Sequence, residues 1–187
     1  MTQECIADQT GKSIESVMLP SFQIVSVFHS AMATFFAPSD PSGSHGMRQE
    51  HIRSTPSWHG GEPRHDCAFV VVDEERPGMR GMAVVRVRLF FSVEFDMVHY
   101  PCALVEWFKT VWCNPSMGMW IVRPDCTHNK QDKSVLHINT FLHAAHLIPV
   151  YGHQKVPLDF HFLYSLDAFE GFYVNKYIDH HAFEVVF

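Results

Sequence analysis

Five arginines are the clearest candidates for binding chemistry in the 187-residue sequence. Seven of the eight arginines lie between residues 48 and 88, and Trp58 is within that stretch. Guanidinium groups contact phosphates and stack on bases, and a neighbouring aromatic ring adds a stacking surface. The alternative for Arg88 is an ion pair with Glu106 across a hairpin, worth about 0.2–1 kcal/mol, with the other arginines solvated. We predict contacts to nucleic acid or to a partner protein from Arg48, Arg53, Arg64, Arg86 and Arg88.

Acidic residues give a weaker indication of catalysis. DNA cutting and joining requires two metal ions held by converging carboxylates. Asp73, Glu74 and Glu75 together with Glu184 are the set that could be imagined for this role. Because Asp73 directly follows an apolar run, a solvated turn is the simpler interpretation. An independent nuclease is therefore disfavoured, and we predict no catalytic residues.

Histidine is unusually frequent, with 14 residues. On a helix, His143 and His146 would point to one side, whereas His180 and His181 would face opposite ways in a strand. A metal site is one explanation for these pairs. Half-buried histidines that hydrogen bond to the backbone are the more common one, so we predict no metal and no cofactor.

The five cysteines do not favour zinc or thiol chemistry. Cys113, Cys126 and His128 share a loop region, but the tight CxxC pairs of structural zinc sites are missing. Cys102 follows a proline inside a predicted strand, which does not favour a reactive thiolate. A metal-dependent His/Cys enzyme is therefore the least favoured alternative. The odd number of cysteines and a polar N-terminus predict an intracellular, reduced protein.

Composition limits the other function classes. The net charge is −6 with neutral histidines and the pI is about 6.1, which disfavours strong non-specific binding to nucleic acid. Residues 22–37 are apolar but interrupted, and they are too short to span a bilayer. No membrane partner and no small-molecule substrate are predicted. A hydrophobic fraction of 47% is ample for the core of one domain.

A long β-hairpin is the strongest structural prediction. Val85, Val87, Leu89, Phe91 and Val93 alternate with mostly polar residues, which is typical of a half-buried strand. Residues 100–108 repeat the pattern. A turn at residues 96–98 would pair Val87 with Trp107, Arg88 with Glu106, Leu89 with Val105, Phe90 with Leu104 and Phe91 with Ala103.

The remaining segments complete a β-rich pattern. Strands are predicted at residues 67–72, 119–122, 135–139 and 182–187, a helix at 21–36, and a helical turn at 141–147. Residues 166–174 fit either state, residues 1–20 read as weakly structured, and residues 47–65 read as irregular. The sum predicts a mainly β (β-rich α+β) fold. It would be a small twisted antiparallel barrel or sandwich with one or two short helices and a loop-rich N-terminal region.

Many short segments, in matching order and spacing, resemble the C-terminal region of Plavaka-like (CACTA-type) fungal transposases. The resemblance covers roughly residues 33–187, and residues 1–20 do not fit it. The segments that carry it are Phe35–Gly43, Gly46–Arg48, Glu50–Arg53, Pro56–Trp58, Arg64–Phe69, Pro77–Gly81, Arg86–Ser92, Tyr100–Val105, Trp107–Phe108, Gly118–Trp120, His137–Thr140, Ala144–Ile148, Val150–Gly152, Leu166–Phe169, Phe172–Tyr177 and Asp179–Glu184.

The resemblance implies a fragment of a DNA-cutting enzyme without its nuclease domain. It implies an N-terminal extension at residues 1–33, with one possible helix, and a single β-rich transposase C-terminal-like domain at residues 34–187. The expected function is a non-catalytic, nuclear module that contacts DNA or the rest of a transposase. The alternative from another class is a small β-barrel protein-interaction domain unrelated to DNA.

Overall fold

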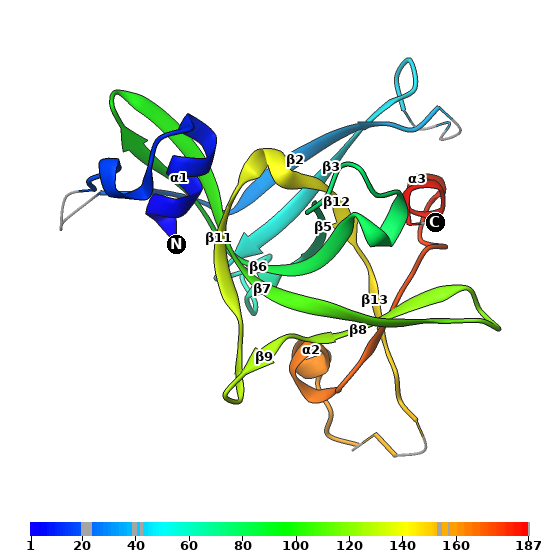
Figure 1. Cartoon of the computed structure of the whole chain (residues 1–187). Helices are drawn as coiled ribbons and strands as arrows, with labels where there is room; N and C mark the ends of the chain where they lie inside the picture. Colours follow the sequence, from blue (N-terminus) through cyan, green and yellow to red (C-terminus); the bar gives the residue numbers. More distant parts are fainter. Residues whose placement is uncertain (20–23, 39–40, 42, 153–154, 157, 187) are drawn as a thin grey trace.

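The computed structural model describes residues 1–19, 24–38, 41, 43–152, 155–156 and 158–186. Strands dominate these residues, and the helices are few and short (Figure 1). The strands are β1 (Ser26–Phe28), β2 (Ser30–Phe36), β3 (Met47–Thr55), β4 (Arg64–His65), β5 (Cys67–Val71), β6 (Met82–Phe95), β7 (Val98–Asn114), β8 (Met119–Pro124), β9 (Cys126–Thr127), β10 (Lys130–Gln131), β11 (Lys133–His137), β12 (Phe141–Ala145), β13 (Leu147–Pro149) and β14 (Phe172–Val174). The α-helices are α1 (Thr2–Thr10), α2 (Ser165–Ala168) and α3 (His180–Val185), and the 3-10 helices are η1 (Ile14–Ser16), η2 (Gly78–Arg80), η3 (Ile138–Thr140) and η4 (Phe162–Tyr164).

One antiparallel sheet organises the molecule. Its strands follow the order β12-β5-β6-β7-β8-β14-β13, with β1 added to β6 and β11 added to β7. The two ends of this order, β12 and β13, are separated in the chain by one residue, His146. The sheet is therefore nearly closed into a barrel, and the predicted mainly β fold is confirmed. None of the described helices has the length and apolar character needed to cross a membrane.

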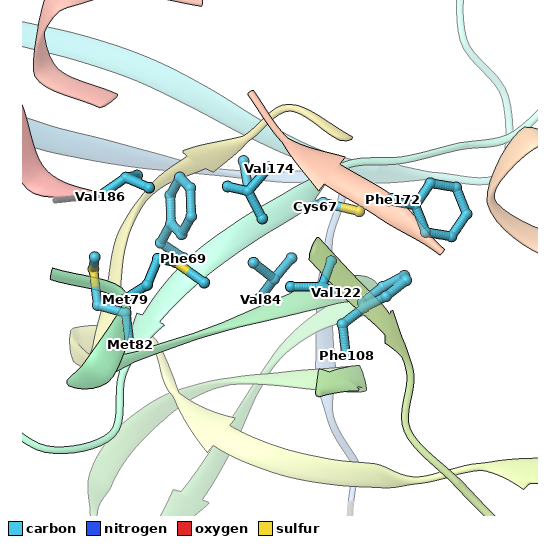
Figure 2. Packing of buried hydrophobic residues seen from close by; sticks show 11 residues of the cluster. Cys67, Phe69, Met79, Met82, Val84, Phe108, Val122, Phe172, Val174 and Val186 are labelled. Atoms are coloured by element: carbon cyan, nitrogen blue, oxygen red, sulfur yellow. The ribbon is translucent and has the colours of Figure 1, made fainter. Parts of the chain in front are cut away.

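The interior of the barrel is apolar. Phe69, Val84, Val122, Phe172 and Val174 come from four different strands and are essentially inaccessible to solvent. Figure 2 shows these side chains converging on one space, with Phe108 near Phe172. The rings of Phe108 and Phe172 meet edge to face with centroids 5.8 Å apart, a favourable aromatic geometry. Burial of these side chains supplies the main driving force for closing the sheet.

The outer face of the sheet is covered too. Val85, Val87 and Ala103 pack there with Ile52 of β3 and with partly buried side chains of β12. At the far end of the β6–β7 hairpin, α1 covers a third cluster that includes Cys5, Ile6, Phe91, Val93 and Cys102. In Figure 1, α1 (blue) lies beside the hairpin and β11. Both faces of the central strands are thus buried, which explains their high apolar content.

The predicted hairpin forms, but its predicted register is wrong. Phe95 pairs with Val98, so the turn consists of Asp96 and Met97 alone, both with positive φ. Leu89, Phe90 and Phe91 pair with Leu104, Ala103 and Cys102, whereas Val87 pairs with Val105 and Val85 with Trp107. The register is one residue off the prediction near the turn and two residues off beyond Arg88.

A bulge at Arg88 causes the second shift. The register of β6 changes between Val87 and Leu89. An extra residue in one strand moves every later side chain to the opposite face. Val85 and Val87 consequently share a face with Phe90, whereas Phe91 and Val93 lie on the other face. The apolar residues of β6 that were predicted to share one face therefore lie on two opposite faces. Trp107, predicted to pair with Val87, pairs with Val85. It is half-buried, and its indole N–H donates to Ser134 Oγ at 2.7 Å.

The N-terminal third contains more regular structure than predicted. The predicted helix at residues 21–36 is wrong where it is described, because β1 and β2 occupy that stretch; residues 21–23 lie outside the described residues. Residues 2–10, predicted to be weakly structured, form α1. Residues 47–65, predicted to be irregular, contain β3 and β4; residues 47–53 of β3 pair with β2, and Ser54 and Thr55 pair with β4.

Of the predictions for the rest of the chain, some are confirmed and others are wrong. The strands predicted at 67–72, 119–122 and 135–139 correspond to β5, β8 and β11. The helical turn predicted at 141–147 is wrong, since β12 pairs with β5 there. The strand predicted at 182–187 is also wrong: α3 ends at Val185, and residue 187 is outside the described part of the chain. Residues 166–174, left open, divide into the end of α2 and β14.

Candidate nucleic-acid interface

The loop between β3 and β4 presents Trp58. The loop is held by hydrogen bonds from Trp58 N to Glu62 O and from Gly61 N to Trp58 O, each 3.0 Å long. Ser57 Oγ donates to Gly61 O at 2.9 Å, and His59 and Gly60 take positive φ at the tip. Trp58 remains 36% exposed. A short, internally bonded loop thus offers an indole surface to a ligand.

Two of the predicted arginines lie against this ring. The guanidinium carbon of Arg53 is 4.7 Å from the Trp58 ring centroid, and that of Arg64 is 4.9 Å away. Both distances are typical of cation–π contact. Asp66 aligns the pair: Arg64 donates to its two oxygens at 2.7 and 3.2 Å, and the Arg53 backbone N–H donates to it at 2.9 Å. The carboxylate also neutralises part of the positive charge.

A pocket of about 610 Å³ opens beside Trp58 and contains a third predicted arginine. Its lining includes Arg64, Arg86, His65 and Phe162. Arg86 is only 8% exposed, and its Nη1 donates to Asp167 of α2 at 2.7 Å. Among the described residues, its buried Nε has no hydrogen-bond partner. A buried guanidinium with an unused donor in a pocket suits an anionic ligand.

His65 lines the same pocket as Arg64 and Arg86. Its Nδ1 is 2.9 Å from Ser54 Oγ. Burial lowers the pKa of His65, and the nearby charges of Arg88 and Arg86 lower it further. The ring is therefore kept neutral, and the positive charge of the site comes from guanidinium groups.

The other two predicted arginines are outside this cluster. Arg48 is on β3 close to β2 and lines a separate pocket with Thr34 and Met47. Arg88 occupies the bulge, where its Nη1 is 3.8 Å from Glu106. This is the ion pair considered as the alternative for Arg88, although the backbone partner of Glu106 is Arg86. Lys133 Nζ approaches the same carboxylate at 3.1 Å.

A second, more acidic pocket of about 440 Å³ adjoins the first through Arg64. His143 is 1% exposed there, and its Nε2 faces Glu50 at 3.5 Å and Asp179 at 3.4 Å. His143 also packs against Phe35 and His181, with ring centroids 4.6 and 5.1 Å away. This group joins β3, β12 and the start of α3. The sequence carries no local signal for it, because residues 50, 143 and 179 are far apart in the chain.

The histidine pairs do not have their predicted geometry. His143 is on β12, and His146 falls between β12 and β13 with its Nδ1 3.1 Å from Asn175 Nδ2. His180 and His181 are in α3, and only His181 is buried. Across the described residues, no group of three or more His, Cys, Asp or Glu side chains is placed to hold a metal ion.

Comparison with known proteins adds no assignment. No family model, no curated protein and no solved structure matches the chain. The chemistry must therefore be argued from the site itself. The arginine and tryptophan cluster (Arg53, Trp58, Arg64 and Arg86) provides positive charge, an aromatic surface and an unused buried donor.

Proposed function

We propose that the chain is a non-catalytic module that contacts DNA through the arginine and tryptophan cluster. The observation that carries the proposal is the contact of Arg53 and Arg64 with the partly exposed Trp58 ring, beside a pocket that Arg86 also lines. Among the described residues, the buried Nε of Arg86 has no hydrogen-bond partner. Guanidinium groups suit phosphate oxygens, and the indole suits an unpaired base. The resemblance to transposase tails supports DNA as the polyanion and a nuclear location.

The charges of the site limit the affinity. Asp66 and Asp167 pair with Arg64 and Arg86, and Glu62 is at the pocket edge. With two or three phosphates contacted, the slope of log K against log salt should be about −2 for a single strand. The contact is therefore a modest one that adds to other contacts in a larger assembly, in keeping with a tail module.

Fluorescence anisotropy with a labelled single-stranded oligonucleotide at low salt tests the proposal. Trp58→Ala should weaken binding about 5–150-fold, because base stacking on an aromatic side chain contributes about 1–3 kcal/mol. Arg53→Gln should weaken binding less and make the salt slope shallower. Arg48→Gln is the matched control, since it removes the same charge outside the cluster. Absence of salt-dependent binding, or equal losses for Arg48→Gln and Arg53→Gln, would refute the proposal.

The module is proposed to lack nuclease chemistry. Asp73 accepts from Arg76 in an exposed turn, with 3.0 Å between Oδ2 and Nε. This is the arrangement of a solvated turn and not of a metal-binding carboxylate set. Purified protein incubated with plasmid and magnesium or manganese should leave the DNA intact. Metal-dependent cleavage that persists through repeated purification would overturn this part of the proposal.

Protein interaction is the second candidate, favoured by the outer face of β2. β2 is an edge strand of the β2-β3-β4 sheet, and it exposes Met32 at 53% and Phe36 at 62%. Met47, opposite Phe36, is exposed as well. Phe36→Ser should leave DNA affinity unchanged if the first proposal holds. If Phe36→Ser abolishes binding of partner proteins and Trp58→Ala does not, protein interaction is favoured over DNA contact.

A further inference from the structure

Two buried thiols from distant parts of the chain are in contact at the far end of the hairpin. Cys5 Sγ of α1 and Cys102 Sγ of β7 are 3.7 Å apart, and 96 residues separate them in the sequence. Cys5 is 6% exposed and Cys102 is 1% exposed. Among the described residues this is the one contact between two cysteine sulfurs. We propose that Cys5 and Cys102 form a reversible disulfide that fastens α1 to the sheet.

The position of α1 favours this pairing over other cysteines. Ile6 and Ala7 beside Cys5 are buried against the cluster that contains Phe91 and Val93. At the other end of the segment, Lys12 Nζ bonds to Asp96 in the hairpin turn at 2.7 Å. These contacts hold Cys5 over Cys102, and Figure 1 shows α1 lying along this end of the molecule. The sulfurs must approach by less than two ångströms to reach disulfide bonding distance.

The two thiols have different acidities, which orders the reaction. The hydrogen bond with Cys102 lowers the pKa of Cys5. The same contact, followed by burial, raises the pKa of Cys102. Cys5 is therefore the thiolate that attacks first, and Cys102 is the thiol that resolves the intermediate. Once Cys5 is bonded to another sulfur it has no negative charge, so the main cause of the raised pKa of Cys102 is removed.

The oxidant is a low-molecular-weight disulfide such as oxidised glutathione. Cys5 Sγ attacks one sulfur, the S–S bond breaks, and the first small thiolate leaves and takes up the proton given up by Cys5. Cys102 Sγ then attacks Cys5 Sγ and expels the second small thiolate, which takes up the proton from Cys102. The protein loses two hydrogens and two electrons, and the small disulfide becomes two thiols.

Access to Cys5 depends on local opening of α1. The helix is nine residues long and has no side-chain hydrogen bond at its N-cap. Short helices without caps open at lower free energy than the sheet they cover. Opening exposes Cys5 to the small disulfide, and closing returns it to Cys102. The disulfide would then prevent further opening, so the oxidation state would set how firmly α1 covers the sheet.

Peptide mapping of the full chain tests the proposal. After incubation with oxidised glutathione under native conditions, trypsin should release residues 1–12 linked to residues 89–109, the fragments that contain Cys5 and Cys102. Dithiothreitol should separate them. Cys5→Ser and Cys102→Ser should abolish this species, whereas the exposed-site control Cys126→Ser should retain it. Stable glutathione adducts without the cross-link, or mixed links to other cysteines, would overturn the proposal.

Hydrogen exchange measures whether the disulfide limits the opening of α1, which peptide mapping does not show. Amides of residues 5–10 should exchange about tenfold or more slowly in the oxidised protein, because opening of α1 is blocked. Amides of β8 and β14 should not change. Equal exchange of α1 in both oxidation states, or loss of the near-ultraviolet circular dichroism of the fold on oxidation, would show that the bond does not form in the native arrangement.

Discussion

The two halves of the β6–β7 hairpin differ, although one alternating pattern runs through both. In the proximal half (residues 82–87 and 105–114), β5 and β8 flank the hairpin, and side chains of both faces are buried in the barrel interior or under β3 and β12. In the distal half (residues 89–95 and 98–104), β1 and β11 are the main neighbours and α1 covers one face. The bulge at Arg88 lies where the neighbouring strand of β6 changes from β5 to β1.

This coincidence gives the bulge a role in closing the sheet. A β-bulge bends its strand and increases the local twist. The bend lets the proximal half join the barrel while the distal half leaves it to form a separate layer with α1. One inserted residue thus converts a continuous hairpin into two packing environments. The apolar alternation of the sequence is kept on both sides, but the two sides face opposite ways.

Deletion of Arg88 is the strongest test of this comparison. Without the extra residue the ladder from Val87 to Leu89 becomes regular, so Phe90, Phe91 and Val93 keep their faces. The bend is lost, however, and the barrel interior and the layer with α1 can no longer both pack. We expect a loss of more than about 4 kcal/mol in unfolding free energy, the range of severe core disruption. Arg88→Gln keeps the chain length and removes only an ion pair, so it should cost about 1 kcal/mol or less. Urea titration measures both, and similar losses would refute the role of the bulge.

Matched phenylalanine truncations compare the two environments directly. Phe172→Ala removes a fully buried ring from the barrel interior and should cost about 4–5 kcal/mol. Phe91→Ala should cost about 3 kcal/mol or less, because α1 can shift to fill part of the cavity. Hydrogen exchange should show that Phe91→Ala loosens α1 while the proximal strands stay protected. Equal costs with uniform loss of protection would show that the halves unfold as one unit.

The sequence predicts elements whose signal is local and misses those decided by distant partners. The apolar run at residues 67–71 is sufficient to identify β5. Phe28, Met32 and Phe36 are spaced by four, which fits one side of a helix but equally the outer face of a strand. Pairing of β1 with β6 and of β2 with β3 decides for strands, and no local feature of the sequence indicates either pairing. The helix α3 had a usable signal: Asp179 is its N-cap and accepts from Ala182 N at 2.8 Å.

The candidate site, too, could be predicted from the sequence only in part. The composition of residues 48–88 identified Arg53, Arg64 and Arg86. The fold brings Arg64 and Arg86 to one pocket and places Arg53 against the Trp58 ring beside it. Their carboxylate partners could not be predicted in the same manner, since Asp167 reaches Arg86 from 81 residues away in the sequence. Nor does the alternating pattern reveal the bulge that separates Arg88 from them. Residue type is local information, whereas neutralisation and burial depend on tertiary structure.

The exclusion of water from the proximal half can be measured through Cys67. Burial raises the pKa of Cys67 to about 12, from an ordinary value of 9.0. Between these values the unfolded chain releases a proton that the folded chain keeps, so stability is full below about pH 9 and falls as pH rises. This thiol should contribute a slope of up to about 1.4 kcal/mol per pH unit.

Urea titrations at about pH 8 and pH 10.5, on either side of the unfolded thiol pKa, provide the measurement. Cys67→Ala should lose part of the alkaline decline, whatever the cost of its cavity at the lower pH. The exposed-site control Cys126→Ala should keep the whole decline. An unchanged decline in Cys67→Ala would mean that water reaches the proximal core.

The smallest expected effect is at the tip of the distal half. Met97 has φ +62° in a two-residue turn and is 88% exposed, so its side chain contributes strain without burial. Met97→Gly should stabilise the protein by about 0.5–1 kcal/mol, because glycine adopts positive φ without strain. This value is the net gain after the higher entropy of glycine in the unfolded chain is subtracted. Met97→Ala keeps the Cβ atom and should give no gain, which separates backbone strain from loss of the thioether. Because Lys12 is anchored to Asp96 in this turn, the gain should extend to α1 as slower amide exchange, and a gain confined to the turn would show that the distal layer is not held through its tip.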